Sequence, residues 1–139
     1  FDAESARFYL LSSSPETKDS EWSWKDFQSC VNTQLADTIG NLITRVLRFV
    51  DKHYGDVIPP CAEQFEAELD RVLLTECGPF SDPSESIRAF KFRRACEQLI
   101  ENARVANVFV DKLAPWSLQK SDPAKAAAVL NTCAEWIAY

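Results

Sequence analysis

Residues 23–55 have the pattern of a single long helix with one buried face. The apolar residues recur at steps of three and four, the period of an α-helix: Phe27, Val31, Leu35, Ile39, Leu42, Val46 and Phe49. Ser23 suits the N-cap position, and Gly55 suits the position after the last turn. We therefore predict one uninterrupted helix here, against which the remaining segments pack.

The other segments repeat the helical pattern over shorter stretches, and none shows the alternation typical of a strand. Helical spacing is present in residues 3–11, 62–75, 92–113 and from 123 to the end, with a turn or two at 84–89. With 46% hydrophobic residues and only 3 glycines among 139 residues, the chain has the composition of a globular protein. We predict an all-α, antiparallel helix bundle that forms one domain over residues 1–139.

The formal net charge of −6 limits the kinds of partner. Sequence-independent nucleic-acid binding needs a broadly basic surface, so we expect no DNA partner. The acidic net charge is still compatible with local contacts to a few bases. Two charged runs stand out, one basic (Arg88, Lys91, Arg93, Arg94) and one acidic (Glu63, Glu66, Glu68, Asp70). Each is interpreted as a solvated helix surface.

Groups that would support catalysis or metal binding are scarce. His53 is the single histidine, and no two of the five cysteines have the spacing of a zinc or redox pair. Three glycines cannot form a phosphate-binding loop. We therefore expect no catalytic residue, metal or cofactor in this chain. The absence of methionine, even at position 1, predicts a fragment of a longer protein. No run is apolar enough for a bilayer span, and we expect a cytoplasmic location without a membrane partner.

A polar stripe shares the long helix with the apolar one. Asn41, Arg45, Arg48 and Lys52 fall on one helix face. An amide and a guanidinium one turn apart can hydrogen-bond to the edge of a nucleic-acid base. On the pattern alone, a solvated polar face is the simpler interpretation.

Three segments together resemble the anticodon-binding domain of methionyl-tRNA synthetases. The first is residues 6–11 (Ala-Arg-Phe-Tyr-Leu-Leu) followed by Pro15-Glu16, Asp19 and Trp22-Ser23-Trp24. The second is residues 32–42 (Asn-Thr-Gln-Leu-Ala-Asp-Thr-Ile-Gly-Asn-Leu) with the following Arg45. The third is residues 106–116, which include Ala-Asn-Val-Phe-Val-Asp and end in Ala-Pro-Trp. They occur in the same order as in the family and cover nearly the whole chain. The combination of Gly-Asn-Leu-x-x-Arg with Ala-Pro-Trp is more specific than either motif alone.

The resemblance implies a helix bundle that binds the CAU anticodon loop of methionine tRNA. It assigns contacts with the anticodon bases to Asn41, Arg45 and Trp116, with Pro115 shaping the turn before the indole. Arg48 and Lys52 become candidates for contacts to the tRNA backbone. It further implies a parent methionine–tRNA ligase, whose ATP-dependent chemistry takes place in a catalytic domain of the same polypeptide that these residues do not include.

An alternative hypothesis keeps the helical fold but assigns no RNA binding to it. In this interpretation the chain is a helical protein-interaction module, which the acidic net charge favours. The arrangement of Trp116 separates the two hypotheses. A ring buried in the interior, or turned away from Asn41 and Arg45, would contradict tRNA recognition.

Overall fold

The computed structural model describes residues 2–16, 19–55 and 57–138. Contacts between residues group the chain into two compact units. Unit 1 comprises Phe1–Gly40 with Phe80–Arg104, and unit 2 comprises Asn41–Pro79 with Val105–Tyr139. The prediction of one domain over residues 1–139 stays a prediction.

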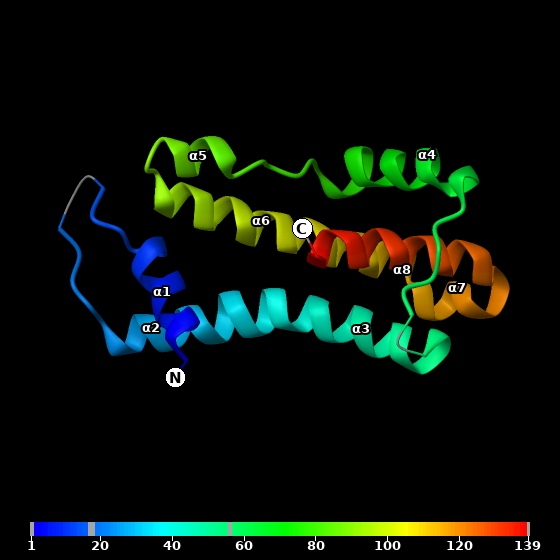
Figure 1. The fold of residues 1–139 in the computed structure, drawn as a ribbon, viewed down its shortest axis with the longest axis horizontal. Coiled ribbons are helices and arrows are strands. Elements are labelled where there is room, and N and C mark those ends of the chain that lie inside the picture. Colours follow the sequence, from blue (N-terminus) through cyan, green and yellow to red (C-terminus); the bar gives the residue numbers. More distant parts are fainter. Residues whose placement is uncertain (1, 17–18, 56, 139) are drawn as a thin grey trace. The chain divides into compact units, whose positions relative to one another are not determined.

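Within the described ranges the chain is helical and contains no strand, which confirms the all-α helix bundle (Figure 1). The elements in order are α1 (Ala3–Ser12), α2 (Trp24–Cys30), η1 (Val31–Gly40), α3 (Asn41–Tyr54), α4 (Glu63–Val72), η2 (Leu73–Cys77), α5 (Ser84–Arg88), α6 (Phe92–Leu113), α7 (Pro115–Ser121) and α8 (Pro123–Ala138). None of these helices combines the length and apolar character that a bilayer crossing needs.

The predicted long helix begins and ends as expected. The Ser23 side chain accepts a hydrogen bond from the Asp26 backbone N–H at 3.2 Å, which satisfies one of the free donors of the first turn. Gly55, with φ of 55°, follows the last turn in the left-handed conformation that glycine adopts without strain.

The interior of this helix differs from the prediction, because η1 between α2 and α3 is a π-helix. The Thr38 hydroxyl donates to the Thr33 carbonyl, five residues earlier, at 2.8 Å. The wider π turns change the angle between successive side chains. The predicted apolar residues Val31, Leu35 and Ile39 are half-buried here. No residue of η1 is buried, whereas Phe27 before it and Val46 after it are. The chain is thus helical from Trp24 to Tyr54, as predicted, but residues 31–40 form a π-helix and not the α-helix that the apolar spacing indicated.

Unit 1 is built around aromatic side chains near the start of α2. Tyr9 of α1 and Phe27 of α2 are buried against each other, with ring centroids 5.5 Å apart. The Trp22 ring lies edge-on to Tyr9 at 5.0 Å. Such edge-to-face contacts add to the area that the rings bury. Arg93 of α6 joins the end of α1 to this unit by donating from Nη2 to the Ser14 carbonyl at 2.7 Å.

Unit 2 is built around α8. Its buried residues are Ala126, Ala128, Val129, Leu130, Cys133 and Ala134. The small side chains allow α7, α3 and α4 to approach it closely. Lys125 of α8 bonds to Glu68 of α4 at 2.8 Å. The Asp122 side chain accepts from the Lys125 backbone N–H at 3.0 Å, and Pro123 is the first residue of α8, which confirms the predicted start of this helix.

Candidate functional site

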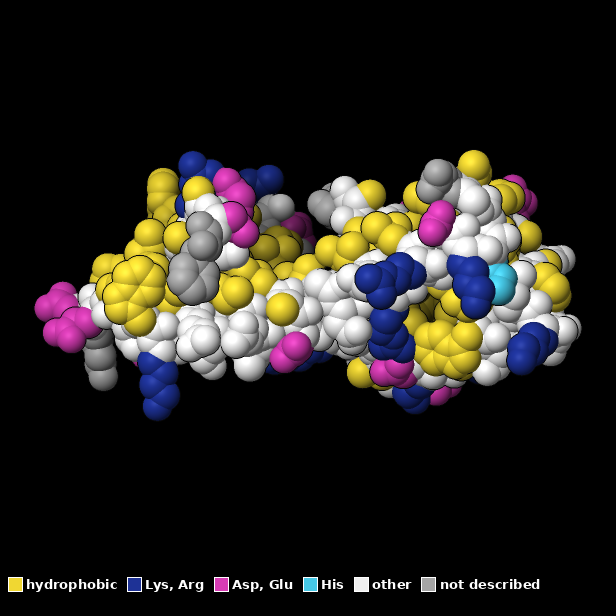
Figure 2. All heavy atoms as spheres, turned by 90° about the horizontal axis from the view of Figure 1, so that it is seen from below, with side chains coloured by type: hydrophobic (Ala, Val, Ile, Leu, Met, Phe, Trp, Pro, Cys, Tyr) yellow, Lys and Arg dark blue, Asp and Glu magenta, His cyan; other side chains and the backbone are white. Residues whose placement is uncertain are grey.

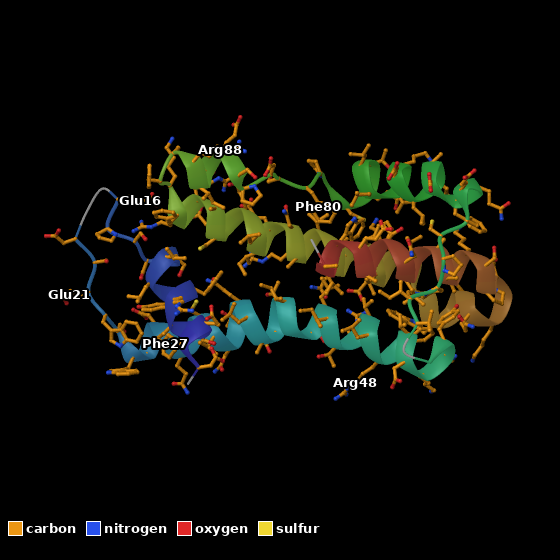
Figure 3. The ribbon with its side chains drawn as sticks, in the orientation of Figure 1. Glu16, Glu21, Phe27, Arg48, Phe80 and Arg88 are labelled. Atoms are coloured by element: carbon orange, nitrogen blue, oxygen red, sulfur yellow. The ribbon has the colours of Figure 1, made fainter. Side chains whose placement is uncertain are left out.

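The polar stripe lies on α3, in unit 2. Asn41 is the first residue of α3 and is exposed, and Arg45 follows one turn later. Arg48 and Lys52 are also exposed, and no ion pair joins either of them to a carboxylate in the described part of the chain. Figure 3 shows Arg48 extending away from α3. The stripe therefore presents amide and cationic groups on the surface.

The segment that carries the tryptophan is a one-residue joint between two helices. α6 ends at Leu113 and α7 begins at Pro115, so Ala114 alone connects them. A residue before proline is disfavoured in the right-handed helical region, which fits the end of α6 at Leu113. Ala114 itself has φ of 42° and ψ of 63°, in the left-handed region that residues other than glycine seldom adopt. Pro115 is buried, and the next side chain, Trp116, keeps 40% of its surface exposed. The joint thus holds an indole at the surface.

Arg45 and Trp116 meet. The Arg45 guanidinium carbon lies 5.2 Å from the centroid of the indole ring, within the range of a cation–π contact. Its Nη2 atom bonds to Asp111 Oδ1 of α6 at 2.5 Å. The Arg45 side chain is 28% exposed and Asp111 is 62% exposed. The ring and the carboxylate therefore fix the guanidinium, while part of the Arg45 side chain stays exposed.

The structure accordingly brings Arg45, Pro115 and Trp116 together, with Asn41 one turn away on the same face of α3. Their contacts with RNA stay predictions. Trp116 is not buried, and its ring faces the Arg45 guanidinium. Its orientation toward Asn41 stays a prediction. Figure 2 shows Lys and Arg side chains gathered around a hydrophobic surface on one face.

Sequence reasoning missed two interactions at this site. Asp111 was part of a matched segment but had no assigned role, and it lies 66 residues from Arg45 along the chain, so no local pattern indicated the pair. The second is a hydrogen bond from the Tyr54 hydroxyl, at the end of α3, to Gln119 Oε1 of α7 at 2.7 Å. It ties the helix carrying Arg45 to the helix carrying Trp116, and it had no local signal.

Unit 1 contains a separate cavity of about 590 Å³. Hydroxyl, carboxylate and guanidinium groups line it, together with the thiols of Cys30 and Cys96. Burial is the main cause that raises the pKa of both thiols, which keeps them protonated and weakly nucleophilic. All five cysteines are free thiols. No group of three or more potential ligands that could hold a metal ion occurs among the residues described.

Comparison with known proteins finds similarity to aminoacyl-tRNA synthetases. The family model "tRNA synthetases class I (M)" matches residues 1–47. The chain is 36% identical over 133 residues to a methionine–tRNA ligase of Methanocorpusculum labreanum and 37% identical over 131 residues to one of Pelodictyon phaeoclathratiforme, in each case over 94% of its length. It is 32% identical to methionine–tRNA ligase 2 of Bacillus cereus over 99% of its length. Over nearly its whole length, the chain is thus similar to one region of proteins named methionine–tRNA ligase.

The match covers one part of these relatives. The chain spans 19%, 18% and 24% of the lengths of the three proteins, respectively. The similarity therefore concerns a single region of a much longer enzyme.

Proposed function

We propose that this chain recognises the CAU anticodon of methionine tRNA as part of a methionine–tRNA ligase. The observation that carries the proposal is the exposed Trp116 ring with the Arg45 guanidinium held over it by Asp111. Kinship with methionine–tRNA ligases along nearly the whole chain supports it.

The geometry suits an unpaired base. Sequence-specific recognition of RNA mostly uses single-stranded loops, whose bases stack on aromatic side chains and hydrogen-bond along their edges. Trp116 offers the stacking surface, and the buried Pro115 keeps it in place. Arg45 offers oriented donors, and Asn41 offers a donor and an acceptor one turn earlier. Arg48 and Lys52 continue the same face and would neutralise phosphates of the loop.

The bond-forming chemistry lies elsewhere in this proposal. The described residues offer neither a metal centre nor an activated nucleophile. The chain also spans at most 24% of the relatives discussed. Joining methionine to tRNA at the expense of ATP would therefore fall to a catalytic domain outside these residues, and this chain would select the tRNA.

Replacing Trp116 by alanine tests the proposal. Trp116→Ala should weaken binding of methionine tRNA at least about tenfold, because a base–aromatic stack contributes about 1–3 kcal/mol. Binding of the same tRNA with a changed anticodon should fall by less than about threefold, because that tRNA does not use the site fully. Trp24→Ala is the matched control, since Trp24 is 67% exposed and lies in unit 1. Affinities are measured by filter binding at one fixed salt concentration.

An equal loss for both tRNAs would contradict anticodon recognition. Unchanged tRNA binding in a variant that lacks Asn41, Arg45 and Trp116 together would favour the protein-interaction module instead.

A further inference from the structure

The turn between α5 and α6 displays a phenylalanine where neither packing nor backbone preference calls for one. Figure 1 shows the chain reversing its direction here, within unit 1. Phe90 is 75% exposed and has φ of 57°. A bulky residue in the left-handed region is a conformational outlier, and such outliers concentrate at functional sites.

The backbone of this turn is the motif that commonly ends helices with glycine. The Lys91 N–H donates to the Ser86 carbonyl at 2.8 Å, and the Phe90 N–H donates to the Ile87 carbonyl at 3.0 Å. This pair of bonds defines a Schellman motif with Phe90 at the position that glycine usually occupies. The hydrogen bonds hold the left-handed conformation, so the ring is displayed on a fixed backbone.

Burial does not compensate for the strain. The ring contact of Phe90 is the edge of Phe92, with centroids 6.0 Å apart. Ile87 on the preceding turn is 48% exposed. The turn therefore presents an apolar and aromatic surface to solvent.

Two cations flank this surface. Arg88 and Lys91 are exposed, and neither forms an ion pair with any carboxylate that the structure describes. Figure 3 shows Arg88 extending away from α5. The two other arginines of the basic run are engaged, because Arg93 bonds to the Ser14 carbonyl and Arg94 pairs with two glutamates of α6. The run is thus divided into two cations with close protein partners and two without a salt bridge, although the pKa of the nearby Asp82 carboxyl is lowered by its hydrogen bonds with Ser84 and, to a smaller extent, by the positive charge of Arg88.

We propose that the α5–α6 turn, residues 87–91, is a second RNA-contacting site, distinct from the anticodon site. Phe90 would stack on a base or ribose, while Arg88 and Lys91 neutralise adjacent phosphates. An exposed aromatic ring between cations has the chemistry of a sequence-tolerant contact to an unpaired strand. The proposal rests on the proposed function, since tRNA is the polyanion that such a chain would meet.

The decisive variant is Phe90→Gly, because it distinguishes loss of an RNA contact from loss of the folded structure. Glycine fits the left-handed position without strain, so the thermal midpoint of the chain should rise. Loss of the stacking surface should weaken binding of methionine tRNA about fivefold or more. A variant that is more stable and yet binds less tightly cannot be explained by misfolding. Leu74→Ala, which removes a 64% exposed apolar side chain in unit 2, is the control and should leave affinity unchanged.

Arg88→Ala tests the charged part of the turn. It should weaken tRNA binding and reduce the slope of log affinity against log salt concentration by about 0.7–1, the value for one phosphate contact. Arg71→Ala, which removes an exposed arginine from α4, should leave the slope unchanged.

The anticodon separates this site from the one on α3. Phe90→Gly should weaken binding of methionine tRNA and of its changed-anticodon form equally, whereas Trp116→Ala affects them unequally. Full tRNA affinity in Phe90→Gly overturns the second site and leaves the anticodon proposal standing. Weakened tRNA binding in Phe90→Gly together with unchanged binding in Trp116→Ala overturns the anticodon proposal and leaves the second site standing. Binding to vesicles with 30% phosphatidylserine that Phe90→Gly abolishes, with tRNA binding intact, would assign the turn to membranes and overturn the RNA contact.

Discussion

At the scale of single residues, Arg45 is the side chain that connects the helices of the candidate site. Its guanidinium lies over Trp116 and bonds to Asp111, so one group from α3 contacts residues of α6 and α7. A side chain held by two partners loses less freedom when it binds a ligand, and this favours specificity. The acidic partner also disfavours additional negative charge close to the ring.

Asp111→Asn should reduce the selectivity of the site. The carboxylate that orients Arg45 would become a neutral amide, so the guanidinium would be held less firmly, while an RNA would meet less negative charge. We expect affinity for the changed-anticodon tRNA to rise relative to that for methionine tRNA. Competition binding with both tRNAs measures this ratio. An unchanged ratio would show that the Arg45–Asp111 pair has only a structural role.

The buried thiol of α8 gives the stability of the chain a dependence on alkaline pH. Burial raises the pKa of Cys133 from an ordinary 9.0 to about 12. Between these values the unfolded chain ionises this thiol and the folded chain does not, so stability falls as pH rises, by about 1.4 kcal/mol per pH unit. In Cys133→Ala this contribution is absent. Urea unfolding at pH 8 and 10.5 should show a smaller loss for Cys133→Ala than for the unchanged chain, with the partly exposed Cys61→Ala as control.

At the scale of elements, η1 has geometry that runs against ordinary helix preferences. Gly40 is its last residue, and a Cβ atom built there would lie 3.2 Å from the Leu35 carbonyl oxygen. That oxygen belongs to the helix backbone and cannot move without disturbing the turn. The glycine is therefore explained by close approach of the backbone and not by flexibility.

Gly40→Ala should consequently fail to stabilise the chain. In an ordinary helix the change from glycine to alanine adds up to about 1 kcal/mol, but here the new methyl group meets the Leu35 carbonyl. We expect the free energy of unfolding to stay equal or fall. Thr44→Ala on the exposed face of α3 is the control and should add about 0.5 kcal/mol. A gain at Gly40 as large as at Thr44 would contradict this account of η1.

The ends of the helices could be predicted from the sequence better than their interiors. Ser23, Gly55 and Pro123 act through local chemistry at one terminus, so their neighbours in sequence suffice to assign them. The π-helix could not be predicted, because an apolar period of three and four leaves the hydrogen-bonding register open. α7 was not predicted either: residues 114–122 carry little apolar periodicity, and a proline such as Pro115 fits a turn as well as the first position of a helix.

The candidate site shows the same limit. The pairing of Arg45 with Trp116 could be predicted only through the resemblance to a family, since the two residues lie on different helices. Asp111 is 66 residues from Arg45 along the chain, and nothing local announces their contact. These contacts arise from tertiary packing, which local sequence patterns do not report.

At the scale of the whole molecule, an acidic chain carries local basic sites. The net charge is −6, yet each of the two proposed RNA sites carries two exposed cations that form no salt bridge with a described carboxylate: Arg48 and Lys52 on α3, and Arg88 and Lys91 at the α5–α6 turn. Such a distribution opposes nonspecific attachment to polyanions and leaves a small number of specific phosphate contacts.

The salt dependence of tRNA binding should reflect this small number. With four cations each meeting one phosphate, log affinity against log salt concentration should have a slope of about −3, at roughly −0.7 per contact. Titrations between 50 and 200 mM salt, an ordinary range for such experiments, give the slope. A slope steeper than about −6 would mean that a broad basic surface binds the RNA, which contradicts the local-contact account.

The single residue that joins α6 to α7 also limits how this segment can vary in length. Consecutive Cα atoms are about 3.8 Å apart, so one inserted residue at Ala114 would move the indole by a distance comparable to the 5.2 Å that separates its centroid from the Arg45 guanidinium. Substitutions can be accommodated there more readily than insertions, and chains that share this site should keep the Ala-Pro-Trp spacing without a gap.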